Sequence, residues 1–457
     1  MGGRRTQSSF TSRRVVVTYV TTGALFTLST SLIWSINTLF LLAAGLSLPM
    51  VFVVNASYTA AQMICELPTG VIADTLGRKV SFLLSVATLL VSTLIYVLSA
   101  QLHWGTPGFL VGSVLIGLGY TFQTGAVDAW MVDALSACEL EKPKDEVFSR
   151  VFALSGAVSG AVLVVGPLLG GILGQYSLYM PYYLRVGSLG LTFLAVALMM
   201  REVGFSPRPL TLRTFASETG KIARSGIQYG VRSRVVQPLM WVSLAQGVFF
   251  AYGFYSLSPY LLDLIGANYV WLTGVVFSAY SLASILGNLS IRWGVMKRSD
   301  GSARSATGAL AVLGVAMAAV VGLVGVAGIL GPRLMGTGLG AFGLVAALWV
   351  ASGYISGLAG PIGSAYINEH TPSAQRATVL SLSALFGDAG AVAGQPAFGY
   401  AAQSWGIAPT WVVGGLILGV VAPLYRLSGR AAASVRARDA FPPDEALESA
   451  PDGARRS

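Results

Sequence analysis

The sequence predicts an all-α membrane protein of about twelve transmembrane helices, arranged as two pseudo-symmetric six-helix halves. Of its 457 residues, 54% are hydrophobic and only 11% are charged, whereas soluble domains carry about 25% charged residues. Apolar runs of about 20 residues, long enough to cross a bilayer, follow one another along most of the chain. A basic segment at 201–236 separates the first six runs from the last six.

Hydropathy places the predicted spans with short connections between them. Their approximate limits are 16–43, 48–73, 80–100, 107–132, 151–174, 182–200, 237–262, 270–293, 304–330, 338–366, 375–401 and 408–427. All Lys and Arg residues except Arg185 and Arg333 then fall on one side of the membrane, which marks that side as cytoplasmic. The +10 net charge comes from these cytoplasmic basic residues, which set the orientation in the membrane and attract anionic lipid. No nucleic-acid partner is therefore expected.

The spans divide the chain into five segments. These are a cytoplasmic N-terminal segment 1–14, a first half 15–200, a cytoplasmic linker 201–236, a second half 237–427 and a disordered cytoplasmic tail 428–457. The first apolar run is too long for a signal peptide, so we expect it to be retained as a span. Residues 210–229 are expected to form an amphipathic helix on the membrane surface. Gly70 and Gly77 recur at equal spacing as Gly287 and Gly294, which supports two repeated halves.

A short basic turn between the second and third spans carries the most specific pattern, Gly70-Val-Ile-Ala-Asp74-Thr-Leu-Gly77-Arg78-Lys79. Arg78 and Lys79 place the turn on the cytoplasmic side. Asp74 lies one helical turn before Arg78, close enough to pair with it. The simplest alternative is an ordinary basic turn that only sets topology.

Twelve spans, a six-plus-six division and this turn resemble the major facilitator superfamily over about residues 15–430. The resemblance implies that the turn forms a cytoplasmic gate. In that gate Asp74 and Arg78 form a charge relay with Asp133, an acid at the inner end of the fourth span, while Gly70 and Gly77 allow close packing. The charged pair is absent from the second half, where Ile291 and Val295 stand at the matching positions.

A second glycine pattern lies in the fifth span and comprises Gly156, Gly160, Gly166, Pro167, Gly170 and Gly171. Small residues at this spacing allow close helix packing, and an internal proline bends a helix. The pattern resembles the antiporter motif of drug–proton exporters in the same superfamily, in which the bent face packs against the other half. Ordinary close packing is the alternative. The arginine that such exporters often carry in the middle of the fourth span is missing here.

Ionisable residues within spans are costly and therefore candidates for function. Glu66, Asp128 and Asp388 are the candidate proton carriers, because a buried carboxyl can bind and release a proton. Each acid could instead serve only to hydrogen-bond a neighbouring helix. Arg185, near the outer end of the sixth span, is interpreted as a side chain that reaches out to the membrane interface.

In the resembling family, spans 1, 4, 7 and 10 line a central cavity. The candidate cavity residues on those spans are Trp34, Asn37, Phe122, Gln123, Gln246, Phe250, Phe254, Trp349 and Tyr354. An aromatic pocket with a few amides suits a hydrophobic or aromatic solute. Aromatic side chains that face lipid would give the same pattern.

These features together predict a secondary transporter, with proton-coupled efflux of a hydrophobic drug, antibiotic or metabolite as the leading hypothesis. The alternative is an uptake carrier for a sugar or another small metabolite. A membrane-embedded enzyme is more remote, because His103 and His370 lie on opposite sides and no Asp-rich motif occurs. The expected partners are a small-molecule substrate, protons and membrane lipid, and no cofactor or metal is expected. Arginine outnumbers lysine 24 to 5, which suggests a bacterium, so we expect a monomer in the inner membrane with both termini cytoplasmic.

Overall fold

The computed structural model describes residues 11–140, 142–205, 230, 232–291, 303–335 and 338–440. Within these ranges the regular secondary structure is entirely helical. The surface helix predicted at 210–229 lies outside the described residues, as does the end of the chain at 441–457.

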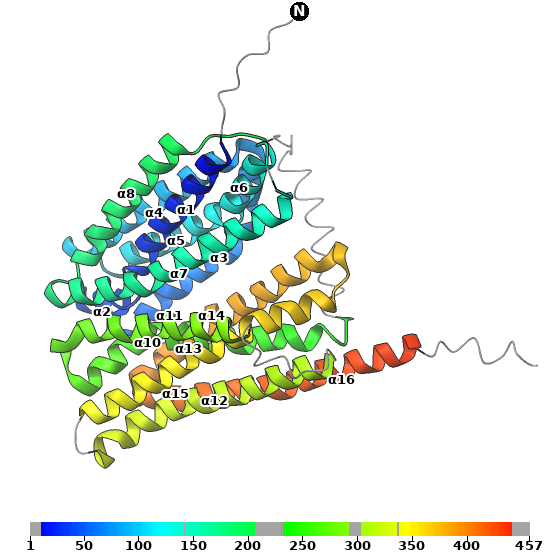
Figure 1. The fold of residues 1–457 in the computed structure, drawn as a ribbon. Helices are drawn as coiled ribbons and strands as arrows, with labels where there is room; N and C mark the ends of the chain where they lie inside the picture. Colours follow the sequence, from blue (N-terminus) through cyan, green and yellow to red (C-terminus); the bar gives the residue numbers. More distant parts are fainter. Residues whose placement is uncertain are drawn as a thin grey trace, which may run out of the picture.

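Two helical bundles lie side by side and correspond to the two predicted halves (Figure 1). The first bundle, blue to green in Figure 1, contains α1 (Ser12–Ser31), α2 (Asn37–Ala43), α3 (Leu48–Leu76), α4 (Arg78–Gln101), α5 (Gly105–Gln123), α6 (Ala126–Ser136), α7 (Lys144–Tyr176) and α8 (Met180–Met199). The second bundle, green to red, contains α10 (Gln237–Ile265), α11 (Val270–Ser290), α12 (Ala303–Leu334), α13 (Gly338–Glu369), α14 (Arg376–Trp405), α15 (Ile407–Leu418) and α16 (Val421–Ala440). Single 3-10 turns at Ala267–Tyr269 and Ser373–Gln375 precede α11 and α14.

Eleven stretches of the described chain are helical, long and apolar enough to cross a membrane. They correspond to eleven of the twelve predicted spans. The first span is the exception, because it folds as α1 and α2 with a turn at 32–36 between them. Its helix α1 has two arginines in the first turn and is rich in Thr and Ser, which lowers its hydropathy.

Two further predicted boundaries need correction. The fourth span is interrupted at Gly125, whose φ of 73° separates α5 from α6. A positive φ is open to glycine without the steric cost other residues meet. The last span continues past its predicted end at 427, because α16 is helical to Ala440 and so includes the start of the predicted disordered tail.

The two halves contact each other mainly along two helix pairs, α7 with α11 and α3 with α14, and more weakly where α2 meets α10. On the second pair, Phe52 of α3 enters the aromatic core of the second half, with its ring centroid 4.7 Å from that of Tyr252. Tyr252 in turn stacks on Phe398 at 4.9 Å. The approach requires Gly399, where an added Cβ would lie 2.9 Å from the Phe52 ring.

Glycines also set the helix spacing inside each half, and Gly357 on α13 provides a test. A Cβ at Gly357 would overlap the backbone carbonyl of Ser284 on α11, whereas a Cβ at the exposed Gly343 of the same helix would meet nothing within 4 Å. We expect Gly357→Leu to lower the free energy of unfolding by about 1–3 kcal/mol, because a packed backbone cannot move aside. Gly343→Leu should change it by less than about 0.5 kcal/mol. Thermal unfolding in detergent measures both, and equal stability of the two variants would contradict this packing.

Candidate functional site

The turn between α1 and α2 is hydrogen-bonded to the second half. The carbonyl oxygen of Ser35 accepts a hydrogen bond from the hydroxyl group of Ser258 on α10 at 2.7 Å. The Thr273 hydroxyl of α11 lies 3.3 Å from the same oxygen and shares its proton with the Val270 carbonyl of its own helix at 2.7 Å. The Ser35 hydroxyl donates to the carbonyl of Pro167 on α7, at 3.1 Å. Ser35, Ser258 and Thr273 are all buried. An interrupted helix inside a membrane leaves backbone groups that need hydrogen-bond partners. Here the second half supplies donors for the backbone carbonyl of Ser35.

The glycine pattern of α7 forms the other side of this junction. A Cβ at Gly166 would overlap the side chain of Ser31, and one at Gly170 would overlap the carbonyl oxygen of Leu32. At Gly171 a Cβ would lie 2.7 Å from the Cα of Gly274 on α11, so these two backbones are in direct contact across the halves. The absence of side chains is therefore what allows α7 to fit between the interrupted first span and α11.

The members of this pattern are not equivalent. Gly160 faces Ile285 of α11, with the Cβ position 3.2 Å from the terminal methyl carbon. Gly156 has nothing within 4 Å of its Cβ position. Packing against the other half thus involves Gly160 and Gly171, while Gly166 and Gly170 pack against α1 and the turn after it.

Further contacts between the halves lie toward the helix ends that are near the Ser35 turn. The Gln395 side-chain amide donates to the hydroxyl of Thr59 at 3.4 Å, and the backbone N–H of Trp271 donates to the side-chain oxygen of Gln175 at 3.2 Å. The Trp34 and Phe254 rings meet edge to face at 5.6 Å. Within the described parts of the chain, the hydrogen bonds between the halves are confined to this region. It is the region predicted to face outward.

A pocket of about 70 Å³ lies beside this junction and receives residues from both halves. Trp34 and Asn37, two of the predicted cavity residues, line it, and Tyr255 of α10 contributes from the second half. Its remaining lining is rich in phenol, hydroxyl and amide groups: Thr30, Ile33, Asn55, Tyr58, Tyr96, Ser113, Ile116, Tyr120 and Arg185. This pocket is more polar than the aromatic cavity that the sequence predicts.

The position of the Arg185 side chain differs from the one that the sequence predicts. Its side chain does not reach the membrane interface but is buried, with only 1% of its surface exposed. Its Nε donates to the hydroxyl of Thr93 on α4 at 3.1 Å. The ion pairs among the described residues involve Arg78, Lys142 and Arg150, and no described acidic residue lies within ion-pair distance of Arg185. The prediction failed because position along a span does not reveal which way a side chain points.

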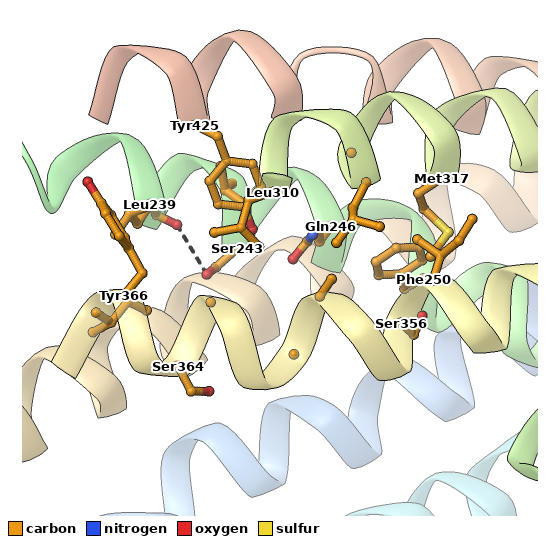
Figure 2. A pocket seen from close by; sticks show the side chains of 18 residues that line it. Leu239, Ser243, Gln246, Phe250, Leu310, Met317, Ser356, Ser364, Tyr366 and Tyr425 are labelled. Atoms are coloured by element: carbon orange, nitrogen blue, oxygen red, sulfur yellow. Dashed lines mark hydrogen bonds between the residues drawn. The ribbon is translucent and has the colours of Figure 1, made fainter. Parts of the chain in front are cut away.

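A larger cavity, of about 290 Å³, lies within the second half (Figure 2). Helices α10, α12, α13 and α16 enclose it, and Figure 2 shows Gln246 and Phe250 of α10 among its lining, with Tyr425 reaching in from α16. Gln246 and Phe250 were predicted to line a central cavity. They line instead a cavity to which only the second half contributes.

The other predicted cavity residues take several positions. Phe254 contacts Trp34 as described above. Phe122 and Trp349 belong to the packed interior, with Trp349 stacked on Tyr280 at 4.8 Å. Tyr354 is partly exposed and donates to Ser290 at 3.1 Å, and Gln123 is half-buried at the end of α5. Phe122, Gln123, Trp349 and Tyr354 therefore do not gather at one site.

The three membrane acids have different surroundings. The Tyr19 hydroxyl donates to Asp128 at 2.5 Å, so this carboxylate has a structural partner on α1. Glu66 on α3 and Asp388 on α14 have no hydrogen-bond or ion-pair partner among the described residues, and they are close enough for their charges to interact. The helices α3 and α14 that carry them pack together across the halves, with Glu66 exposed and Asp388 partly buried. The described residues include no group of three or more His, Cys, Asp or Glu placed to hold a metal ion.

The basic turn forms a charged cluster at the opposite, predicted cytoplasmic end. Arg78 pairs with Asp74 at 2.7 Å, and its Nε lies 4.0 Å from a carboxylate oxygen of Asp133. Gly77, with a φ of 112°, ends α3 and starts α4, while Gly70 has nothing within 4 Å of its Cβ position. The structure thus brings together the three charged residues predicted to meet.

Glu202, which follows α8, completes this cluster and was not predicted. Its two carboxylate oxygens accept hydrogen bonds from the backbone N–H groups of Arg78 at 2.8 Å and Lys79 at 3.0 Å. An acid at a helix N-terminus satisfies free N–H groups and complements the helix dipole. Glu202 therefore ties the end of the sixth span to the start of α4. No local pattern indicates a contact between residues so far apart in sequence.

The fold is that of solved membrane transporters. The structure of the nucleoside transporter NupG has a TM-score of 0.68 and 12% identity, with coverage of 91% of this chain and 98% of that one. A D-xylose–proton symporter has a TM-score of 0.67 and 14% identity, with coverage of 90% and 97%. At such low identity these likenesses establish the fold alone.

The sequence comparisons identify the family. A profile described as Major Facilitator Superfamily matches residues 19–345. The chain therefore belongs to the major facilitator superfamily. The tetracycline resistance protein of class C from Escherichia coli is 32% identical over 168 residues, which are 36% of this chain and 38% of that protein. The class H protein from Pasteurella multocida is 29% identical over 150 residues, 33% of this chain and 34% of the relative. The chain thus matches little more than a third of the length of these relatives.

The Glu202 contact provides a test of the charged cluster. We expect Glu202→Ala to lower the free energy of unfolding by about 1 kcal/mol, the usual effect of losing a helix N-terminal cap. Glu146, which makes exposed ion pairs with Lys142 and Arg150, is the matched control. Glu146→Ala should have an effect below about 0.5 kcal/mol. Thermal unfolding of the purified variants measures both, and a Glu202→Ala protein as stable as the control would show that this cap contributes nothing.

Proposed function

We propose that this protein is a secondary transporter that exports a hydrophobic, aromatic drug, antibiotic or metabolite in exchange for protons. One observation carries the transport assignment: a pocket lined by both halves lies beside a junction that joins them only toward their predicted outer ends. Such a molecule can work by alternating access, in which the halves rock about a central site. The structure would then represent the state closed toward the outside.

Two observations support export rather than uptake. The partial similarity is to tetracycline resistance proteins, and the α7 glycines that resemble an antiporter motif form the junction itself. Uptake of a small metabolite is the second candidate, because the fold is shared with a nucleoside transporter and a sugar symporter. The direction of accumulation in sealed vesicles separates the two.

For proton coupling we assign Glu66 and Asp388 the leading roles. Both acids lie on helices that join the halves, so a relative movement of α3 and α14 changes their surroundings. Among the described residues neither has a bonding partner that would fix its charge. Asp128 is a weaker candidate because Tyr19 already holds its carboxylate.

The charged cluster at Asp74, Arg78 and Asp133 is proposed to act when the inner ends close. In the present structure its ion pairs lie within the first half. It therefore positions the loop without joining the halves in this state. We further propose a monomer in a bacterial inner membrane, with both termini in the cytoplasm.

Transport of tetracycline into everted membrane vesicles tests the proposal. An inside-acid gradient should drive accumulation of the drug, and an uncoupler should abolish it. Glu66→Gln and Asp388→Asn should each reduce gradient-driven accumulation about tenfold or more, a loss equivalent to about 1.4 kcal/mol. Asp74→Asn should also impair transport while membrane insertion stays normal. Asp145→Asn, at the exposed start of α7, is the control and should transport normally.

Two results would contradict the proposal. Absence of gradient-driven accumulation of tetracycline and of other aromatic drugs in the wild type would exclude proton-coupled drug export. Full transport by the combined Glu66→Gln and Asp388→Asn variant would exclude these acids as proton carriers.

A further inference from the structure

The pocket between the halves contains two buried nitrogen donors without partners. Arg185 is 1% exposed and its Nη2 has no hydrogen-bond acceptor among the described residues. Asn55 is 3% exposed and its Nδ2 likewise lacks an acceptor. Both side chains line the pocket. Buried polar groups of this kind are rarely left unpaired, because each costs free energy comparable to a lost hydrogen bond.

A chain of hydrogen bonds orients Asn55. The Tyr182 hydroxyl donates to the Asn37 side-chain oxygen at 2.9 Å. The Asn37 amide nitrogen then donates to the Asn55 oxygen at 3.2 Å. This bond assigns the oxygen of Asn55 as an acceptor and leaves Nδ2 as the donor without an acceptor in a side chain that lines the pocket. Arg185 is held in a similar way, through its Nε bond to Thr93.

The pocket is also positive in charge. Its lining includes Arg185 but no Asp or Glu. A buried guanidinium without a counter-ion is strongly destabilising, by several kcal/mol in typical proteins. An anionic group on a ligand would supply the charge partner that the guanidinium of Arg185 lacks among the lining residues.

We propose that Arg185 and Asn55 bind an anionic group of the transported solute, a carboxylate or an equally acidic oxygen. Arg185 donates from Nη2 and supplies the charge, and Asn55 donates from Nδ2. The rings of Tyr58, Tyr120 and Tyr255 lie around this group and accommodate an aromatic body. At about 70 Å³ the pocket has room for the acidic group. This inference rests on the proposed transport function and narrows it to organic anions.

Binding of matched acids and amides to the purified full-length protein tests the proposal. The probes are benzoate against benzamide and 2-naphthoate against 2-naphthamide, titrated by calorimetry at pH 7, where both acids are ionised. The wild type should bind each carboxylate roughly tenfold more tightly than its amide, as expected for a charge-assisted contact. This readout needs no proton gradient, so its failure leaves the transport test unaffected, and the reverse also holds.

Variants separate a binding role from a structural one. Arg185→Gln should abolish the preference for carboxylates, Arg185→Lys should retain part of it as a point charge, and Asn55→Ala should weaken it about threefold or more. Arg333→Gln, at the exposed end of α12, should leave it unchanged. If Arg185→Gln does not fold, Arg185→Lys and Asn55→Ala decide the question. Equal affinity for acid and amide in the wild type, no binding of either carboxylate at millimolar concentration, or a preference unchanged in the Arg185 and Asn55 variants would overturn the proposal.

Discussion

The structure depends on how the interrupted first span obtains hydrogen-bond partners inside the membrane. The break at 32–36 leaves the Ser35 carbonyl to be satisfied by Ser258 of the second half and, through a longer and shared bond, by Thr273. Each bond contributes about 0.5–1.5 kcal/mol, and an unpaired carbonyl in hydrocarbon would cost several kcal/mol. The halves are therefore held together at this point as long as water is excluded. Separation requires water to reach Ser35, which is what opening toward the outside would supply.

The α7 helix makes this junction possible through shape. Because Gly166, Gly170 and Gly171 lack side chains, α7 can contact the turn after α1 on one side and α11 on the other. The pocket with Arg185 lies beside the same turn, since Trp34 and Asn37 contribute to both regions. The pocket and the junction are therefore neighbours in the structure, and in the proposed transport cycle a solute bound in the pocket would lie next to the contacts that hold the outer ends together.

The sequence predicted well those features that depend on local pattern. Apolar run length located eleven spans, and the spacing of Asp74 and Arg78 predicted their ion pair. It could not predict contacts between distant segments, such as Glu202 with the start of α4. The break in the first span was also missed, because its stability comes from residues more than two hundred positions away. Arg185 was misinterpreted for a related reason, since hydropathy gives depth but not the direction of a side chain.

Distances between spin labels would test most directly whether the Ser35 bonds hold the outer ends together. One pair of labels replaces the exposed residues Ala43 and Ala267 at the predicted outer ends, and the other replaces Leu76 and Ser373 at the inner ends. The two cysteines, Cys65 and Cys138, are first replaced by Ser. In the wild type the outer pair should be close. Combined Ser258→Ala and Thr273→Val substitutions should raise the ratio of molecules open toward the outside to molecules closed toward the outside by about tenfold or more. This change appears as a longer distance for the outer pair and a shorter distance for the inner pair. Unchanged distances in that variant would contradict the central role of this interaction.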